Sequence, residues 1–311
     1  MSQKPSPMKI SVRRGTLLAS LEHAKGKLEL YTNRKKKNGL LNRFAKLAHA
    51  PTKVARIALY RVGLLPLENV HARMFWGGTL TLPMWDEDAV IAYYTGSFGA
   101  AELPLVAYLV RTLDGESVFY DIGSNLGLYA ALAEALGATV HSFEPNPRTT
   151  KYLKVNSRDG STVNVLALSD KKGTIPFFEV SVGRKIGMSS MFPDVVPQTV
   201  DKKPSVMEVE ALPLDEYVAN HAQPTVLKID VMNAEYLVLG GARSFLEASN
   251  PILAIRLYRN PQALERTHET LSLLAELGYE AHSIGDDGTI NPVGIVLEEI
   301  PFVSTFIFKK S

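Results

Sequence analysis

The segment from residue 118 to residue 145 constrains the fold more than any other part of the chain. It holds an apolar run that ends at Asp121 and a glycine turn, a helical pattern over residues 125–136, and a second apolar run that ends at Glu144. Doubly wound sheets use this order of strand, turn, helix, strand and acid to hold an adenosine-containing cofactor at the carboxyl ends of their strands. The segment therefore predicts an α/β fold with a cofactor site.

The turn itself indicates which cofactor. A dinucleotide site has three glycines, so that a pyrophosphate can reach the helix N-terminus, whereas this turn has only Gly123 and Gly127. Asp121 would repel a pyrophosphate but attract the ammonium of an amino-acid group. Glu144 could accept hydrogen bonds from both hydroxyls of a ribose. Together the two acids predict S-adenosylmethionine, with the alternative that they only cap helices.

Composition narrows the class of protein. The chain has 311 residues and is 46% hydrophobic, enough for a sizeable core. It has no cysteine, and its seven histidines show no metal-ligand spacing, so no metal site is predicted. No run approaches 18 apolar residues, so we expect a cytoplasmic protein, with a peripheral position at a membrane as the alternative.

Charge is divided unevenly along the chain. Residues 1–61 hold 15 Lys or Arg and two Glu, whereas the remainder holds 19 basic and 30 acidic side chains. The basic segment includes the run from Arg34 to Lys37, flanked by helical stretches with apolar stripes. It could bind an anionic membrane surface, an acidic polymer or a nucleic acid, or it could be a solvated helical surface packed on the acidic remainder.

The rest of the chain alternates between strand and helix patterns, which predicts a mostly parallel sheet with right-handed crossovers. The expected strands are 117–122, 139–143, 162–168, 225–230, 251–257, 279–284 and 303–308; the expected helices are 101–113, 125–136, 147–157, 213–221, 234–247 and 261–277. Residues 175–208 are rich in turn-forming residues and are expected to form a substrate-facing loop over the cofactor. We divide the chain into a basic helical extension (1–70), a connector with short strands (71–100) and a catalytic domain (101–311).

Several motifs together resemble the FkbM-type family of S-adenosylmethionine-dependent methyltransferases over roughly residues 73–284. The motifs are Phe98-Gly99-Ala100-Ala101-Glu102, Tyr120-Asp121-Ile122-Gly123-Ser124-Asn125-Leu126-Gly127, Phe143-Glu144-Pro145-Asn146-Pro147, Asn156, Ala167-Leu168-Ser169-Asp170, Ser189-Ser190-Met191-Phe192, Leu214-Asp215-Glu216-Tyr217 and Leu227-Lys228-Ile229-Asp230-Val231.

The resemblance implies a doubly wound, seven-stranded, Rossmann-like class I methyltransferase sheet whose last strand is antiparallel. It also implies O-methylation of a hydroxyl on a sugar, glycolipid or related metabolite, so a small-molecule or glycan acceptor is the expected partner. The residues expected to contact the cofactor are Glu102, Asp121, Gly123, Ser124, Asn125, Gly127, Phe143, Glu144, Pro145, Asn146, Leu168 and Ser169.

For catalysis we expect in-line displacement, in which the protein mainly supplies alignment. Asp230, at the carboxyl end of the fourth strand, is the best-placed base, with Glu235 as the second candidate. Lys228 lies on the same side of the strand as Asp230 by alternation, so a pair between them is expected. Tyr258 and His221 are assigned to packing or to the surface.

Two departures from the family pattern bear on catalysis. Family members continue the fourth strand with Glu-Gly-Ala-Glu, whereas this chain has Met232 and Asn233 before Ala234 and Glu235; and Arg256 stands where an acid is usual. Arg256 could hold an anionic acceptor. Three alternatives therefore stay open: a cofactor-binding protein with degenerate catalysis; a nucleic-acid methyltransferase, although no N-P-P-[YFW] motif follows the fourth strand; and, least supported, a dehydrogenase. The oligomeric state, including a homo-oligomer, is also open.

Overall fold

The computed structural model describes residues 7–32, 50–65, 69–182, 185–195, 205–261 and 263–310. The chain divides into two compact units, one up to Arg111 and one from Thr112. The connector proposed at 71–100 and the first residues of the proposed catalytic domain both belong to the N-terminal unit. Of the helices that the structure describes, none combines the length and apolar composition needed to cross a bilayer.

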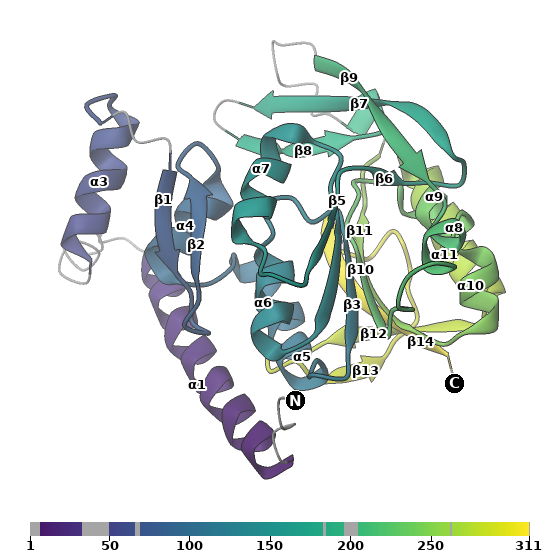
Figure 1. The fold of residues 1–311 in the computed structure, drawn as a ribbon, viewed down its shortest axis with the longest axis horizontal. Helices are drawn as coiled ribbons and strands as arrows, with labels where there is room; N and C mark the ends of the chain where they lie inside the picture. The colour runs from purple at the N-terminus through teal and green to yellow at the C-terminus, as the bar shows by residue number, and fades with distance from the viewer. Residues whose placement is uncertain are drawn as a thin grey trace. The chain divides into compact units, whose positions relative to one another are not determined.

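The N-terminal unit is a small assembly of helices around a two-stranded hairpin (Figure 1). Its elements are α1 (Pro7–Thr32), α3 (Pro51–Arg61), β1 (Asn69–Arg73), β2 (Thr79–Pro83), α4 (Glu87–Thr95), η1 (Ala100–Glu102) and α5 (Leu103–Thr112). The hairpin confirms the short strands expected in the connector. Asp86 caps the start of α4 by accepting a hydrogen bond from the Ala89 N–H, and Gly96 ends it in a left-handed conformation. This helix was not predicted.

The N-terminal helix α1 buries one apolar stripe. Leu17, Leu21 and Leu28 are buried, as the predicted helical stripe requires. The basic run from Arg34 to Lys37 and the second predicted stripe, over residues 40–48, lie outside the described residues.

The C-terminal unit is built on an eight-stranded sheet in the order β13-β12-β14-β11-β10-β3-β4-β5. The strands are β3 (Val118–Ile122), β4 (Thr139–Phe143), β5 (Thr162–Asn164), β10 (Val226–Ile229), β11 (Ile252–Tyr258), β12 (Tyr279–Ile284), β13 (Ile290–Pro292) and β14 (Val303–Lys310). Strands β5, β4, β3, β10 and β11 are parallel, and β14 is antiparallel to β11, as predicted. The sheet has eight strands instead of seven because β13 pairs with the edge of β12.

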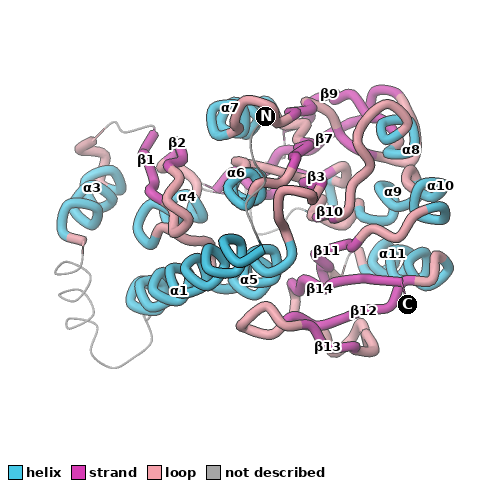
Figure 2. Tube along the Cα trace, turned by 60° about the horizontal axis from the view of Figure 1, so that its bottom comes forward, coloured by secondary structure: helices cyan, strands magenta, loops and turns pink. Residues whose placement is uncertain are grey.

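Helices cover both sides of this sheet. The helices are α6 (Leu128–Leu136), α7 (Pro147–Asn156), α8 (Leu214–Val218), α9 (Glu235–Gly240), α10 (Arg243–Ala248) and α11 (Leu264–Glu276). Figure 2 shows α6 and α7 on one side and α8 to α11 on the other. The helix predicted over 234–247 is two short helices, since the turn at 241–242 separates α9 from α10.

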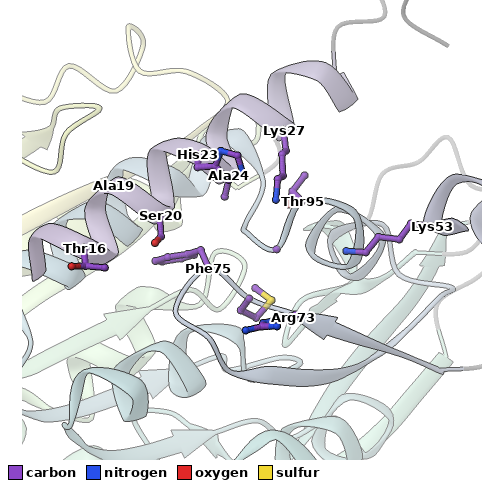
Figure 3. A pocket seen from close by; sticks show the side chains of 12 residues that line it. Thr16, Ala19, Ser20, His23, Ala24, Lys27, Lys53, Arg73, Phe75 and Thr95 are labelled. Atoms are coloured by element: carbon purple, nitrogen blue, oxygen red, sulfur yellow. The ribbon is translucent and has the colours of Figure 1, made fainter. Parts of the chain in front are cut away.

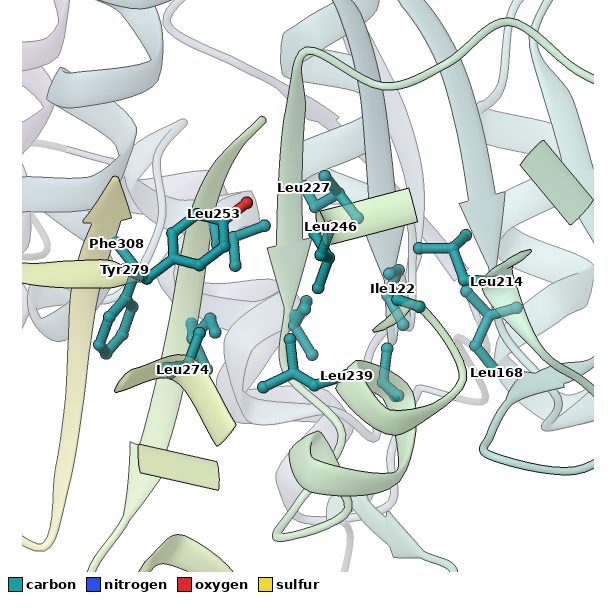
Figure 4. Packing of buried hydrophobic residues seen from close by; sticks show 14 of the residues in the cluster. Ile122, Leu168, Leu214, Leu227, Leu239, Leu246, Leu253, Leu274, Tyr279 and Phe308 are labelled. Carbon is teal, nitrogen blue, oxygen red and sulfur yellow. The ribbon is translucent and has the colours of Figure 1, made fainter. Parts of the chain in front are cut away.

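The core lies between the sheet and the second helical layer. Leu239, Leu246 and Leu274 from the helices pack with Leu227 and Leu253 from the strands (Figure 4). Burying one such leucine contributes roughly 1.5–3 kcal/mol, so this layer stabilises the packing of the helices on the sheet. Strand β10 is buried on every residue, so its three apolar side chains lie in the core and its one cation, Lys228, is buried with them.

The turn-rich segment expected as a loop is instead part of a second sheet, in the order β6-β9-β7-β8. Its strands are β6 (Ala167–Leu168), β7 (Gly173–Val182), β8 (Lys185–Ser190) and β9 (Ser205–Leu212), and η2 (Pro193–Val195) follows β8. The loop prediction was wrong because antiparallel pairing between β7 and β9 overrides the turn composition. The strand predicted over 162–168 is likewise divided between the two sheets.

Candidate functional site

The glycine turn after β3 packs closely against neighbouring parts of the chain. Gly123 has φ +77°, and a Cβ at this position would lie 2.0 Å from the carbonyl oxygen of Asp230. Gly127 has φ +82°, and its Cβ would lie 2.7 Å from Cδ1 of the Leu153 side chain and 3.4 Å from the Leu153 Cα. Asn156 donates from its amide to the Leu126 carbonyl at 3.0 Å. Both glycines are therefore needed for the path of the turn, which brings β3 and β10 together at their ends.

Glu144 links this turn to the end of β4. Its Oε2 accepts a hydrogen bond from the Asn125 N–H at 2.8 Å, and its Oε1 accepts one from the Asn146 N–H at 2.9 Å. Burial raises the pKa of Glu144, and these two N–H donors oppose that rise. Each carboxylate oxygen keeps acceptor capacity, so contact with a ribose diol stays a prediction.

Asp121 and Lys228 form a buried ion pair. The Lys228 Nζ donates to Asp121 Oδ1 at 2.9 Å and to the Gly123 carbonyl at 3.1 Å. Burial by itself would lower the pKa of Lys228, but the Asp121 and Asp230 carboxylates outweigh it and raise the pKa. The expected pair of Lys228 with Asp230 is wrong, because Lys228 lies directly opposite Asp121 in the register of β10 and β3.

Asp230 instead has two partners from the end of β11. Its Oδ1 accepts a hydrogen bond from the Tyr258 hydroxyl at 2.6 Å, and its Oδ2 pairs with Arg256 at 3.1 Å. Burial and the Asp230 carboxylate raise the pKa of Tyr258 well above its ordinary value. Sequence reasoning missed this role of Tyr258. The signal was its place two residues after Arg256, on the same side of a strand adjacent to β10.

Glu235, at the start of α9, is buried beside this group. Its Oε1 accepts a hydrogen bond from the Val231 N–H at 3.0 Å. Burial raises its pKa to about 8, with a further contribution from the charge of Asp230. A carboxyl group with this pKa can gain or lose a proton near neutral pH.

The residues that depart from the family pattern have unusual backbone conformations. Met232 has φ +54° and Asn233 has φ +68°. Asparagine adopts this left-handed region more readily than other residues with a side chain, so Asn233 keeps a turn that a glycine would make. Its amide also donates to the Tyr258 carbonyl at 3.3 Å and to Thr267 Oγ1 at 3.2 Å.

The second sheet contacts both parts of the site. At the end of β8, Ser189 accepts a hydrogen bond from the Asn146 amide at 3.2 Å, and Ser190 donates to the Met232 carbonyl at 2.9 Å. Phe192 stacks on Tyr236. The end of β8 is therefore attached to the turn after β4 and to the turn after β10.

Of the other residues predicted to contact the cofactor, some lie at the strand ends and some in the hydrophobic core. Ser124 joins the two strand ends by donating to the Asp121 carbonyl and accepting from the Phe143 N–H. Phe143 and Leu168 belong to the hydrophobic core, Pro145 is half-buried, and Ser169 pairs through its backbone with Leu212. Glu102 lies in η1 of the N-terminal unit, so its role stays a prediction.

Among the described residues predicted to contact the cofactor, two have a buried acceptor atom that lacks a partner, namely Asp121 Oδ2 and Asn125 Oδ1. Leaving such atoms unsatisfied is costly. With the Glu144 carboxylate, they make a set of acceptors at the ends of β3 and β4. This set would suit a ligand that offers an ammonium group and hydroxyls.

The family model and the relative that match this chain are both described as methyltransferases. The sequence model of one protein family, the methyltransferase FkbM domain, matches residues 121–281 of this chain. Hexuronic acid methyltransferase AglP of Haloferax volcanii is 27% identical over 157 residues, which cover 49% of this chain and 61% of that protein. The chain thus spans less than two thirds of the length of this relative.

Two solved structures show distant similarity to this chain. The methyltransferase FkbM structure from Methylobacillus flagellatus has 14% identity and a TM-score of 0.42, covering 85% of this chain and 60% of that one. A fibrillarin structure from Aeropyrum pernix, with natively bound S-adenosyl-L-methionine, has 14% identity and a TM-score of 0.36, covering 66% and 73%. Both TM-scores are below 0.5.

Proposed function

Because the chain belongs to the FkbM methyltransferase family, we propose that it transfers a methyl group from S-adenosylmethionine to a hydroxyl of a sugar. The name of the Haloferax volcanii relative supports a sugar acceptor. The observation that carries the proposal is the set of buried acceptors formed by Asp121, Asn125 and Glu144.

These residues fit the groups that S-adenosylmethionine presents. Asp121 Oδ2 would accept from the ammonium group, and Glu144 would accept from the ribose hydroxyls. Asn125 Oδ1 offers a further acceptor in the same turn. When bound, S-adenosylmethionine supplies a methyl group on a sulfonium, so that transfer forms an O–C bond and breaks the S–C bond. Lys228 serves here as a positioning residue that holds Asp121 and the Gly123 carbonyl.

Asp230 is the proposed base for the acceptor hydroxyl. Tyr258 and Arg256 fix its carboxylate from β11, and a carboxylate oxygen can accept more than one hydrogen bond. The hydroxyl proton passes to Asp230 as the new O–C bond forms. Glu235 is the second candidate, because its pKa of about 8 suits proton exchange near neutral pH.

The departures at residues 232, 233 and 256 do not by themselves favour a degenerate site. Asn233 retains the left-handed turn, and Asp230 is kept. Arg256 is engaged with Asp230, so an acidic group on the acceptor would have to share this guanidinium. Comparing an acidic with a neutral sugar therefore tests the acceptor class.

Calorimetric titration with S-adenosylmethionine and S-adenosylhomocysteine tests the cofactor. We expect Glu144→Gln to weaken binding at least tenfold, because it removes a charged acceptor. Glu134→Gln is the matched control, since Glu134 is also buried and also accepts backbone N–H bonds, from Arg158. Absence of binding to the wild type would overturn the proposal.

Methyl transfer is then measured on methyl glycosides of a hexuronic acid and of a neutral hexose. Asp230→Asn should retain cofactor binding and lower kcat by about 10²–10⁴-fold, the usual contribution of a general base. An unchanged kcat would exclude Asp230 as the base. Cofactor binding without transfer to either sugar would support the degenerate alternative instead.

A further inference from the structure

The N-terminal unit contains a pocket of about 560 Å³ that is separate from the site described above. Twelve residues line it, and all of them belong to this unit: Thr16, Ala19, Ser20, His23, Ala24, Lys27, Lys53, Arg73, Met74, Phe75, Thr95 and Gly96. They come from α1, from α3, from the end of β1 and from the end of α4. Distant parts of the chain thus converge on one space.

The pocket concentrates positive charge. Figure 3 shows Lys27 from α1 and Lys53 from α3 pointing toward the same space, and Arg73, which is exposed, also lines the pocket. Among the described residues that line the pocket, none is acidic. Within the part of the chain that the structure describes, Lys27 and Arg73 form no ion pair with a carboxylate. Converging cations without a counter-charge repel one another, and an anion would remove that repulsion.

The ammonium group of Lys53 has N–H donors left for a ligand. Its Nζ donates to the Tyr93 carbonyl at 2.6 Å, in the last turn of α4, where a cation is favoured. An ammonium group has three N–H donors, so two remain for a ligand. Burial, and then the charge of Lys27, lower the pKa of Lys53, as expected for a cation with too little negative charge around it.

The remaining lining residues suggest the kind of anion. The Ser20 hydroxyl adds a polar group that can donate to one oxygen atom of the anion. Met74 is buried and Phe75 is half-buried, so one wall of the pocket is apolar. The volume of the pocket exceeds what a single inorganic ion needs, and it leaves room for carbon atoms against that wall.

We propose that this pocket binds the phosphate group of an organic phosphate ester, with Lys27, Lys53 and Arg73 as its charged contacts and Phe75 against its carbon portion. The ester could be a soluble metabolite or a lipid headgroup, which share this chemistry. The site does not depend on the methyltransferase reaction.

The test is calorimetric titration of the full chain with inorganic phosphate and with glucose 1-phosphate, and sedimentation with vesicles of phosphatidylglycerol or of phosphatidylcholine. The variants are Lys27→Gln and Lys53→Gln. Arg56→Gln is the matched control, because Arg56 lies on α3, is exposed and does not line the pocket. Each pocket variant should weaken binding about tenfold or more, and Arg56→Gln should not.

Each outcome decides the proposal. Tighter binding of glucose 1-phosphate than of inorganic phosphate, lost in both pocket variants, supports a soluble ester. Sedimentation with phosphatidylglycerol alone, lost in the same variants, supports a lipid headgroup. If Arg56→Gln lost as much binding as the pocket variants, the binding would be only a general attraction between opposite charges, and the proposal would be overturned. Absence of binding to every probe would also overturn it. Glu144→Gln should bind these probes like the wild type, which separates this test from that of the cofactor.

Discussion

The two units use positive charge in opposite ways. In the C-terminal unit each cation of the candidate site has a carboxylate, with Lys228 paired to Asp121 and Arg256 to Asp230. In the pocket of the N-terminal unit, Lys27 and Lys53 converge without an acid among the described lining residues. Paired charges position groups for chemistry, whereas unpaired cations leave their donors for a ligand.

Removing one member of the buried pair should be the most damaging change. Lys228→Met leaves Asp121 charged and buried, so we expect the free energy of unfolding to fall by about 3–5 kcal/mol. Lys172→Met is the control, because its pair with Glu216 is exposed and should matter by less than about 1 kcal/mol. Urea unfolding measures both, and equal losses would show that burial does not distinguish the pairs.

Each region also has a glycine whose Cβ would approach a carbonyl oxygen. A Cβ on Gly123 would lie 2.0 Å from the Asp230 carbonyl oxygen. A Cβ on Gly96, which lines the pocket, would lie 2.7 Å from the Arg73 carbonyl oxygen. Gly160 also has a positive φ but has open space around it. Replacement with alanine should cost roughly 1–2 kcal/mol at Gly160, from backbone strain alone, more at Gly96, and most at Gly123. Thermal unfolding gives this order, and a loss at Gly123 no larger than at Gly160 would contradict the close approach.

Glu235 predicts how stability depends on pH. Its carboxyl group ionises near pH 4.5 in the unfolded chain but near pH 8 in the folded protein. The folded protein therefore binds more protons between these values, and the free energy of unfolding should decrease as the pH rises from about 5 to 8. In Glu235→Gln this part of the decrease should be lost. Urea unfolding at pH 5.5 and pH 8 tests this, and identical slopes in both proteins would exclude a raised pKa.

The smallest effect on the free energy of unfolding is expected for a substitution in the pocket. Lys27→Met removes a charge that has no carboxylate partner in the described structure, so stability should change by no more than about 0.5 kcal/mol. The change should be neutral or favourable, since repulsion of Lys53 is relieved. Unfolding in urea at low salt measures it. A loss as large as that of Lys228→Met would show that Lys27 has a structural partner.

The central strands of the sheet were predictable because nearly all of their residues are buried. The runs that end at Asp121 and Glu144 form β3 and β4 as expected, and the last strand is antiparallel. Asn146 with Pro147 also starts α7 as predicted. By contrast, α4 lacks a long periodic pattern, and the strands of the second sheet are hidden in a segment of turn-forming residues. Their pairing depends on β9, which lies far along the chain from β7.

The order of the strands and the position of the acids at their ends follow from local patterns, because apolar runs and glycine turns act over a few residues. The partners of those acids do not. Alternation along one strand placed Lys228 with Asp230, but the register between β10 and β3 placed Lys228 against Asp121 and left Asp230 to Tyr258 and Arg256. Ion pairs form across neighbouring strands at hydrogen-bonding distance, and only the tertiary structure decides which residues come that close.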